Sequence, residues 1–386
     1  MSDNMKVGPK SPQRGAVELT KTTKTSAVHT PKVETPRAPT TTTTEGPVSA
    51  LFSDSRKEST AKKPGTLKPH EALMTSHSKP RYASFADAFS SVVGKNAIDD
   101  LKQWATAGTK PIVLIAGDQC TGKGTAADGV VSDLGGKSTG TGSVLRALSK
   151  ENGLTIEQMS AMLSGKSVDV DDGKGGTKKV ALSDYPHLGS ADDVDVKLDF
   201  RAAKAIATSS LTKADGASID VSVFESRLAG HLGQFLEGLG RQNIVSVYLY
   251  AAPRVQAERY LDREVWKPAE AAASTSAQKQ AIVDGRAQAA RILAGLDDSV
   301  PLGVALQKLV DGLQGSAVTG LDVLAQKVTG IAGRDDNDKT RLLSLYGVNY
   351  QDRSAFDVVV DTNGKTPDQV KQAILDAVSQ KTASPS

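Results

Sequence analysis

A short run of glycines, hydroxyl residues and one lysine at positions 117–125, GDQCTGKGT, has the residue types and spacing that bind phosphate. Glycines let the backbone turn sharply and bring its N–H groups toward phosphate oxygens. A lysine at this spacing reaches the terminal phosphates of a nucleotide, and a hydroxyl just after it serves a magnesium ion. We therefore expect a nucleotide site here, with Thr125 as the metal ligand. Its binding residues are Gly117, Thr121, Gly122, Lys123, Gly124 and Thr125.

The segments around this loop have the order that a phosphate-binding loop requires. Residues 111–117 form a short apolar run that predicts a buried strand, and a predicted helix follows the loop. The N-terminus of that helix would add the positive end of its dipole. The alternative is a plain glycine-rich turn, which leaves Lys123 unexplained. A GTPase is not favoured, because Gly124 separates Lys123 from Thr125 and no N-K-x-D sequence follows.

A second charged group lies at residues 334–341, RDDNDKTR. Positions i, i+4 and i+7 share one face of a helix, so Arg334, Asp338 and Arg341 should project together, with the carboxylate orienting both guanidinium groups. Guanidinium groups suit the charge that spreads over a phosphoryl group during its transfer. The alternative is an exposed helix face with ion pairs and no catalytic role. The predicted catalytic set is Lys123, Arg334, Asp338 and Arg341.

The elements that must position these groups alternate between strands and helices. Apolar residues from Phe85 to Trp104 fall at helical spacing, and residues 264–333 have helical periodicity that predicts a helical insertion. The alternation predicts an α/β fold with a doubly wound parallel sheet and helices on both faces. Strands are predicted at 111–117, 217–226, 243–251 and 356–362, and further helices at 255–263 and 367–379.

The first 80 residues differ in composition from the rest, and we predict that they are disordered. They are rich in Thr, Ser, Pro and Lys and lack hydrophobic periodicity. Residues 1–95 carry 15 Lys and Arg against 8 Asp and Glu, so the basic excess of the chain lies there. A basic tail of this kind is more often simply solvated, and the alternative is that it binds a protein partner; we expect neither a membrane nor a specific nucleic acid as a partner.

A cytoplasmic location is predicted from three features. The single cysteine excludes an intrachain disulfide framework, and no apolar run is long enough to span a membrane. The N-terminus also lacks the apolar stretch of a secretory signal. The alternative is secretion into a host cell, because the composition of the tail resembles the leaders of proteins that pass through bacterial injection systems.

Five further segments resemble, in order, the cytidylate kinase family of P-loop nucleoside-monophosphate kinases, especially its archaeal pattern. Residues 139–160 look like the family's T-G-x-x-x-R helix, and 193–202 look like its aspartate-rich stretch. Residues 223–230 resemble its strand-end E-G-R signature, and 248–264 resemble the strand and helix that lead into a mobile lid. Residues 334–362 are similar to its R-D-x-x-D-x-x-R motif and last strand.

This resemblance implies a P-loop NTPase fold with a mobile helical lid, forming a kinase domain over residues 81–386. The implied donor is ATP with Mg²⁺, held by the loop residues named above. The implied acceptor is a pyrimidine nucleoside monophosphate, CMP or dCMP. By the same match, the acceptor-binding residues are Thr141, Arg146, Glu225 and Arg227.

The chain also departs from the family pattern. Residues 164–184 interrupt the region near the acceptor site, and residues 264–333 enlarge the lid. Cys120 stands where these kinases have a glycine, and Gly140 replaces the aspartate of the bacterial D-T-G sequence. Two alternatives therefore stay open. One is a kinase of the same fold with another small acceptor, and the other is an exported effector or scaffold that binds nucleotide with little turnover.

Overall fold

The computed structural model describes residues 79–209, 221–318 and 320–383. The tail that the sequence predicts to be disordered, residues 1–80, lies outside this part of the chain except for its last two residues. None of the helices in the described ranges combines the length and the apolar content that crossing a membrane requires.

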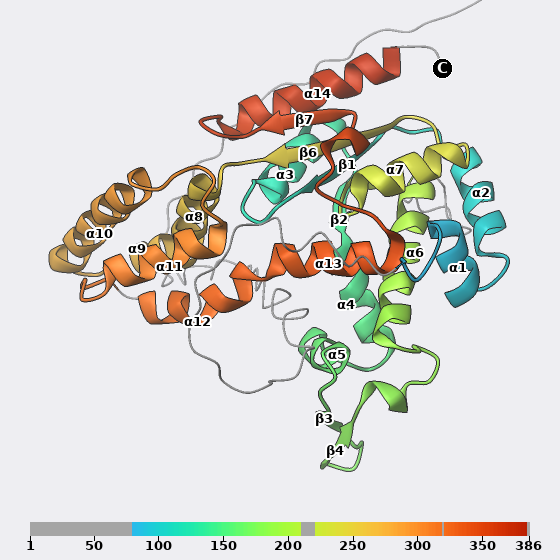
Figure 1. Cartoon of the computed structure of the whole chain (residues 1–386), viewed down its shortest axis with the longest axis horizontal. Helices are drawn as coiled ribbons and strands as arrows, with labels where there is room; N and C mark the ends of the chain where they lie inside the picture. Colours follow the sequence, from blue (N-terminus) through green and yellow to red (C-terminus); the bar gives the residue numbers. More distant parts are fainter. Residues whose placement is uncertain (1–78, 210–220, 319, 384–386) are drawn as a thin grey trace, which may run out of the picture. The chain divides into compact units, whose positions relative to one another are not determined.

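Five parallel strands form the central sheet (Figure 1). Their spatial order is β2-β5-β1-β6-β7, so β1 lies in the middle. β1 is buried over its whole length, which explains why its sequence is continuously apolar and not alternating. The strands are β1 (Ile112–Gly117), β2 (Lys137–Gly140), β5 (Val221–Glu225), β6 (Ile244–Tyr250) and β7 (Val358–Asp361).

Helices cover both faces of this sheet. Val113 and Ile115 of β1 point to one face, where α3 and α14 pack, whereas Ile112 and Leu114 point to the other, as strand alternation requires. Figure 1 shows α14 lying along β7. The predicted α/β class with a parallel sheet between helices is confirmed and is consistent with a doubly wound fold. The first layer is α3 (Lys123–Leu134) and α14 (Pro367–Ala383); the second contains α1 (Phe85–Val92), α2 (Ala97–Ala107), α6 (Ala191–Ala207), α7 (Ala229–Gly238) and α13 (Arg334–Tyr346).

A group of helices between β6 and α13 builds a core of its own. Leu306, Leu309 and Leu313 are fully buried in it, so the helical periodicity predicted for this region is confirmed. The first helix continues through a π-helical turn into the second without a loop. The elements are α8 (Pro253–Leu261), the π-helical turn η4 (Asp262–Trp266), α9 (Lys267–Ala272), α10 (Ser276–Ala294), α11 (Leu302–Leu313) and α12 (Leu321–Ala332).

A smaller unit lies between β2 and β5. The side chains of Met159 and Met162 meet Val170 and Val180 of an antiparallel hairpin in a small apolar core. The segment at 164–184, which departs from the family pattern, folds into this hairpin and a short 3-10 turn. The elements are α4 (Thr141–Glu151), α5 (Ile156–Leu163), β3 (Val168–Asp171), β4 (Thr177–Val180) and η3 (Leu182–Asp184).

The observed boundaries differ from the predicted ones in a few places. The helical spacing from Phe85 to Trp104 is divided between α1 and α2 near Gly94, whose φ of +136° ends the first helix. The sequence does not predict β2, because KSTG is short and polar; the strand forms by pairing with β5 at the sheet edge. Residues 217–220 of one predicted strand lie outside the described residues. A 3-10 turn, η5 (Arg353–Ala355), precedes β7.

Candidate functional site

The 117–125 loop begins at the carboxyl end of β1, in the middle of the sheet. The connection after β1 leads to β2 on one side, whereas the connection after β6 leads to β7 on the other. The connections after the neighbouring strands β1 and β6 therefore run in opposite directions along the sheet. Open α/β sheets bind ligands in the crevice that forms at such a point. The fold places the loop predicted to bind phosphate where α/β proteins hold ligands.

Two glycines give this loop its path. Gly117 has a φ of +143°, and a Cβ atom there would overlap the carbonyl oxygen of Leu249, so only glycine fits. Gly122 has a φ of +93° and immediately precedes α3. Helix α3 has no side-chain cap and no acidic residue in its first turn. Its first backbone N–H groups can therefore meet an anion from outside the helix.

Lys123, the first residue of α3, folds back over the loop. Its Nζ donates to the carbonyl oxygen of Gly117 at 2.9 Å and to that of Asp118 at 2.6 Å. Burial, followed by the charge of Arg227, lowers the pKa of Lys123 from 10.5 to about 8. The lysine is thus charged at neutral pH at an energetic cost, which an anion in the loop would offset.

Arg259 of α8 and Thr362, just after β7, hold the loop from its other side. Arg259 donates through Nη1 to the carbonyl oxygen of Cys120 at 3.3 Å and through Nη2 to that of Thr362 at 2.8 Å. The Thr362 hydroxyl donates to the carbonyl oxygen of Thr121 at 3.3 Å. These bonds satisfy carbonyl groups of the loop with protein donors and fix its backbone.

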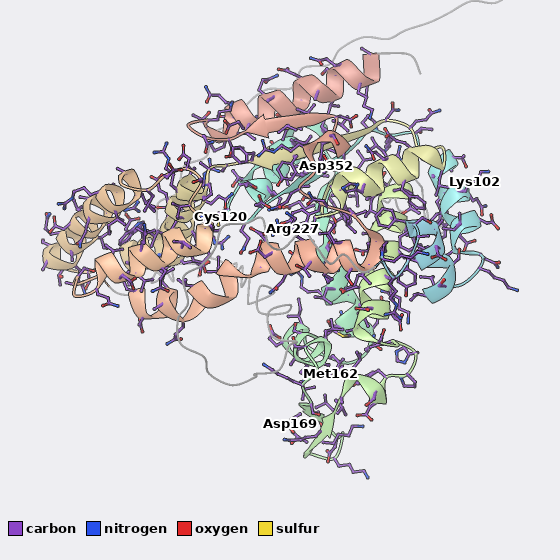
Figure 2. All side chains as sticks on the ribbon, viewed as in Figure 1. Lys102, Cys120, Met162, Asp169, Arg227 and Asp352 are labelled. Atoms are coloured by element: carbon purple, nitrogen blue, oxygen red, sulfur yellow. The ribbon has the colours of Figure 1, made fainter. Side chains whose placement is uncertain are left out.

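Cys120, which stands where the kinases that the sequence resembles have a glycine, is accommodated by packing. Its φ of +56° is uncommon for a residue other than glycine. The side chain packs against the core of helices α8 to α12 (Figure 2), and burial raises the pKa of its thiol. A thiol with a raised pKa is mostly protonated and is a poor nucleophile. Cys120 therefore acts here as a small apolar side chain.

Arg227 lies at the centre of a buried charge cluster between the sheet and α13 (Figure 2). Its Nη1 donates to the carbonyl oxygen of Gly117 at 2.5 Å, its Nε donates to Asp338 at 3.2 Å, and its Nη2 pairs with Asp335. The guanidinium group also lies over the ring of Tyr350, 5.1 Å from its centroid. The sequence assigns Arg227 to an acceptor phosphate, but the structure shows its guanidinium engaged with the loop and two carboxylates of α13.

Asp118, the second residue of the loop, is a carboxylate held by three uncharged donors. The hydroxyl groups of Tyr248 and Tyr350 donate to it at 3.2 and 3.1 Å, and Nε2 of Gln351 donates at 3.0 Å. Arg227 Nη1 lies 3.8 Å from the same carboxylate. These partners compensate a negative charge that would otherwise oppose phosphate in the loop.

Arg334, the first residue of α13, has a guanidinium nitrogen that lacks a hydrogen-bond acceptor in the described part of the chain. Its Nε is buried and has no hydrogen-bond acceptor, and no carboxylate of the described residues lies within ion-pair distance of its guanidinium group. Burial lowers the pKa of Arg334, and the charge of Arg227 acts in the same direction, whereas the carboxylates of Asp338 and Asp335 oppose the shift. Burying a cation without a partner is costly. Arg334 lies in the first turn of the helix that contacts the loop through Asp335, so its guanidinium group could meet an anion that binds there.

Asp338 is oriented differently from the expectation. Its carboxylate lies 3.7 Å from Nη2 of Arg341 and 3.2 Å from Nε of Arg227, and it has no such contact with Arg334. Arg341 also pairs with Asp195 of α6 at 3.3 Å. The difference arises because Arg227 reaches this helix face from the end of β5, a contact that spacing within one helix does not reveal. Asp338 and Arg341 thus join α13 to the sheet and to α6.

The other residues expected to bind an acceptor lie at the ends of neighbouring strands. Glu225 ends β5 and pairs in register with Gly140 of β2, so both strand ends share one edge of the sheet with the loop. Thr141 begins α4, and its hydroxyl is buried without a hydrogen-bond partner. Arg146 is exposed on α4 and donates to the Ser143 hydroxyl at 3.1 Å.

Gly124 and Thr125 are both exposed in the first turn of α3. Thr125 is the residue expected to bind magnesium. Across residues 79–209, 221–318 and 320–383, no group of three or more His, Cys, Asp or Glu side chains is arranged to hold a metal ion. Magnesium in phosphate-transfer sites takes many of its ligands from substrate phosphates and water.

No role is predicted from the sequence for Asp118, Arg259, Asp335 or Tyr350, although each contacts the loop or Arg227. The sequence could have indicated a role for Asp118 and Asp335, because a carboxylate within or beside a phosphate-binding motif needs a partner that compensates its negative charge. No local signal existed for Arg259 and Tyr350, because their bonds to the loop join residues 139 and 232 positions apart.

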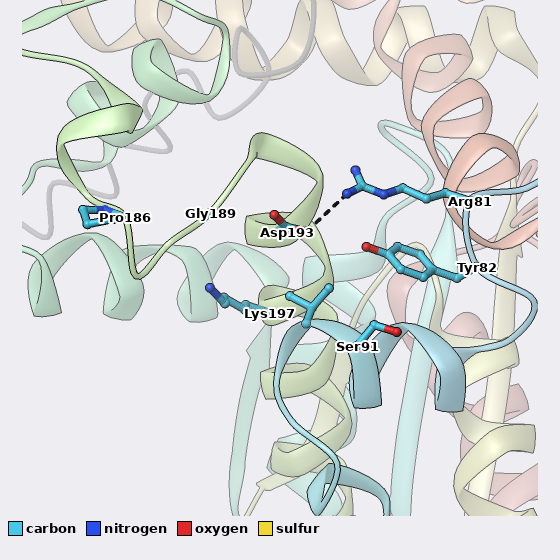
Figure 3. A pocket seen from close by; sticks show the side chains of 8 residues that line it. Arg81, Tyr82, Ser91, Pro186, Gly189, Asp193 and Lys197 are labelled. Atoms are coloured by element: carbon cyan, nitrogen blue, oxygen red, sulfur yellow. Dashed lines mark ion pairs between the residues drawn. The ribbon is translucent and has the colours of Figure 1, made fainter.

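A pocket of about 460 Å³ lies elsewhere, between the segment before α1 and the start of α6 (Figure 3). Its charged side chains already have partners. Arg81 lies 3.5 Å from Asp193, and Lys197 donates to the carbonyl oxygens of His187 and Leu188 at 2.6 and 2.8 Å. No residue predicted for the nucleotide site lines this pocket, so it is not part of that site.

Comparisons with known proteins identify no family. No protein-family model matches the chain, and no curated protein matches it. Among solved structures, the chain is similar to the crystal structure of an uncharacterized protein from Eubacterium ventriosum ATCC 27560, at 10% identity and a TM-score of 0.33. That match covers 70% of this chain and 99% of the other. A TM-score this low does not establish a shared fold.

Proposed function

We propose that this protein is an ATP-dependent phosphotransferase of the P-loop type that acts on a pyrimidine nucleoside monophosphate, CMP or dCMP. One observation carries the proposal: the uncapped N-terminus of α3, at the middle of a parallel sheet, begins with Lys123, whose Nζ bonds among the described residues only to two loop carbonyl oxygens, and α13, which contacts the loop through Asp335, begins with Arg334, whose Nε is buried without an acceptor in the same part of the chain. The helix dipole, the first backbone N–H groups of α3 and these two cations together favour a ligand with several negative charges.

The donor site is the 117–125 loop. Backbone N–H groups of the loop and of the first turn of α3 face the phosphates of ATP, and Lys123 reaches the terminal ones. Gly117 and Gly122 give the backbone the shape it needs, and the Thr121 hydroxyl stabilises that shape by donating to the carbonyl oxygen of Asp118 at 3.0 Å. The exposed Thr125 hydroxyl would bind the magnesium ion that accompanies ATP.

The acceptor site is proposed at the ends of β2 and β5, which lie at the same sheet edge as the loop. The N-terminus of α4 with Thr141, and the exposed Arg146, supply donors for the acceptor phosphate. Glu225 would contact the nucleoside. The sequence resemblance to cytidylate kinases supports CMP or dCMP as the acceptor, and Arg227 contributes by holding the loop.

The reaction breaks the bond between the γ-phosphorus and the β–γ bridging oxygen of ATP and forms a bond to an acceptor phosphate oxygen. The products are ADP and a nucleoside diphosphate. Negative charge spreads over the equatorial oxygens during transfer, and Lys123 and Arg334 stabilise it. No covalent nucleophile is needed. Helices α8 to α12 are proposed to close as a lid, because water in an open site would hydrolyse ATP.

A coupled ADP-release assay with ATP, magnesium and a panel of nucleoside monophosphates tests this proposal. We expect turnover with CMP or dCMP that falls by about 100-fold or more in Lys123→Met and in Arg334→Met. Lys102→Met, at an exposed position of α2, is the matched control and should keep wild-type turnover.

Other outcomes separate the alternatives. Turnover with a sugar acid or another alcohol, and none with CMP or dCMP, would keep the phosphotransferase and refute the acceptor. ATP binding without turnover on any acceptor would refute the enzyme and favour a nucleotide-binding effector or scaffold.

A further inference from the structure

Asp335, the second residue of α13, places a carboxylate against the 117–125 loop. Its Oδ2 accepts a hydrogen bond from the backbone N–H of Gln119 at 3.4 Å, and its Oδ1 pairs with Arg227. Backbone N–H groups of such a loop are the groups that bind phosphate oxygens, and a guanidinium fork accepts carboxylate and phosphate alike. The carboxylate therefore has the partners that a phosphate oxygen would seek in this loop.

We propose that Asp335 competes with the donor phosphate for the N–H of Gln119 and thereby lowers the affinity of the loop for nucleotide. Only one of the two anions can accept this hydrogen bond at a time. The inference rests on the proposed function, since it concerns the donor site of that reaction. It makes Asp335 a residue that sets donor affinity without taking part in the transfer.

The charges around Asp335 make its carboxylate displaceable. Burial has the largest influence and raises the pKa of Asp335. Arg227 and Lys123 favour the charged carboxylate, whereas Asp118 and Asp338 oppose it. The bond that the Asp335 carboxylate accepts from the Gln119 N–H is long, at 3.4 Å, and is weaker than an ordinary hydrogen bond. A polyphosphate brings more negative charge to the same two cations and should displace it.

Displacement of the Asp335 carboxylate from the Gln119 N–H would affect the junction between α12 and α13. The side chain of Gln119 donates from Nε2 to the carbonyl oxygen of Ile331 at 3.1 Å, so Gln119 holds the end of α12 as well as the start of α13. When a phosphate takes the backbone N–H, one of these two ties is lost. The first turn of α13 then keeps its ion pair with Arg227 but loses its bond to the loop backbone.

Isothermal titration calorimetry of the full chain with ATP and with inorganic tripolyphosphate tests this competition. Asp335→Asn keeps the size of the side chain and removes its charge. We expect both ligands to bind about tenfold tighter than to wild type, because removing a competing state raises the apparent affinity. Asp336→Asn, at the exposed neighbouring position, removes the same charge and should change the affinity by less than about twofold.

Unchanged or weaker binding by Asp335→Asn would overturn the competition and leave the phosphotransferase standing, provided that wild type binds and turns over ATP. A gain of the same size in Asp336→Asn would also overturn it, because net charge and not this contact would be responsible. If wild type and variants bind neither ligand, both proposals fail.

Folding of each variant is checked by circular dichroism, since Arg227 loses one partner. If the asparagine variant does not fold, Asp335→Ser removes the same carboxylate and should show the same gain. Asp335→Glu keeps the charge and should bind no tighter than wild type.

Discussion

Replacing Lys123 by methionine is expected to stabilise the protein while it abolishes phosphoryl transfer. Burial and then the charge of Arg227 lower the pKa of Lys123 from 10.5 to about 8, so the folded state disfavours the charged form. Methionine has a similar length, fills the same space and has no charge to bury. A residue assigned to the proposed phosphoryl transfer thus reduces the stability of the fold that carries it.

The expected magnitude follows from the pKa shift. A difference of about 2.5 pKa units between the unfolded and folded chain corresponds to a cost of roughly 3 kcal/mol at neutral pH. Partial exposure of the side chain reduces this figure. The variant also loses two hydrogen bonds, from Nζ to the carbonyl oxygens of Gly117 and Asp118, worth about 1 kcal/mol each. We expect a net gain of about 1 kcal/mol in the free energy of unfolding.

The pH dependence of this gain is the sharper measurement. Because the folded-state pKa is lowered, the cost in wild type is fully present below about pH 8 and disappears as the pH rises to about 10.5. Urea denaturation of both proteins between about pH 7 and pH 10 should therefore show the advantage of the variant shrinking and then reversing. Lys102→Met controls for the loss of an exposed lysine. A difference that stays constant or grows with pH would refute the reasoning.

Two further substitutions test buried and strained positions. Burial raises the pKa of Asp199 to about 7, so ionisation of this carboxyl group opposes folding as the pH rises from about 4 to about 7. Asp199→Asn can still accept a hydrogen bond from the Tyr346 hydroxyl and should raise the melting temperature more at about pH 8 than at about pH 5. Equal gains at the two pH values would contradict this reasoning. Gly117→Ala should lower the free energy of unfolding by about 2–4 kcal/mol and remove ATP binding, because a Cβ would overlap the Leu249 carbonyl at a φ of +143°. Gly124→Ala meets open space and is the matched control, so equal losses in urea denaturation would count against the argument.

The parts of the fold whose conformation depends on residues adjacent in the chain can be predicted from the sequence. The continuous apolar run of β1 predicts a strand buried on both faces, and the periodic leucines at 306–313 predict the helix that buries them. The path of the 117–125 loop is likewise visible, because Gly117 and Gly122 stand where the backbone takes positive φ. β2 escapes prediction because four polar residues become a strand only through pairing with β5.

The ion-pair partners of the charged residues cannot be predicted from the sequence in this way. Spacing along one helix shows that Arg334, Asp338 and Arg341 can share a face, but it does not show that Arg227 arrives from β5 and pairs with Asp338. That contact joins residues 111 positions apart, and the Nε of Arg334 is buried without an acceptor among the described residues.

The physical reason for this division lies in the range of the interactions. Backbone conformation follows from local sterics and from the period of burial, which adjacent residues encode. Pairing of charges depends on which strand ends meet at one edge of a sheet, and no local pattern encodes that meeting. The position of Asp335 against the N–H of Gln119, 216 residues earlier in the chain, is therefore a product of the tertiary fold.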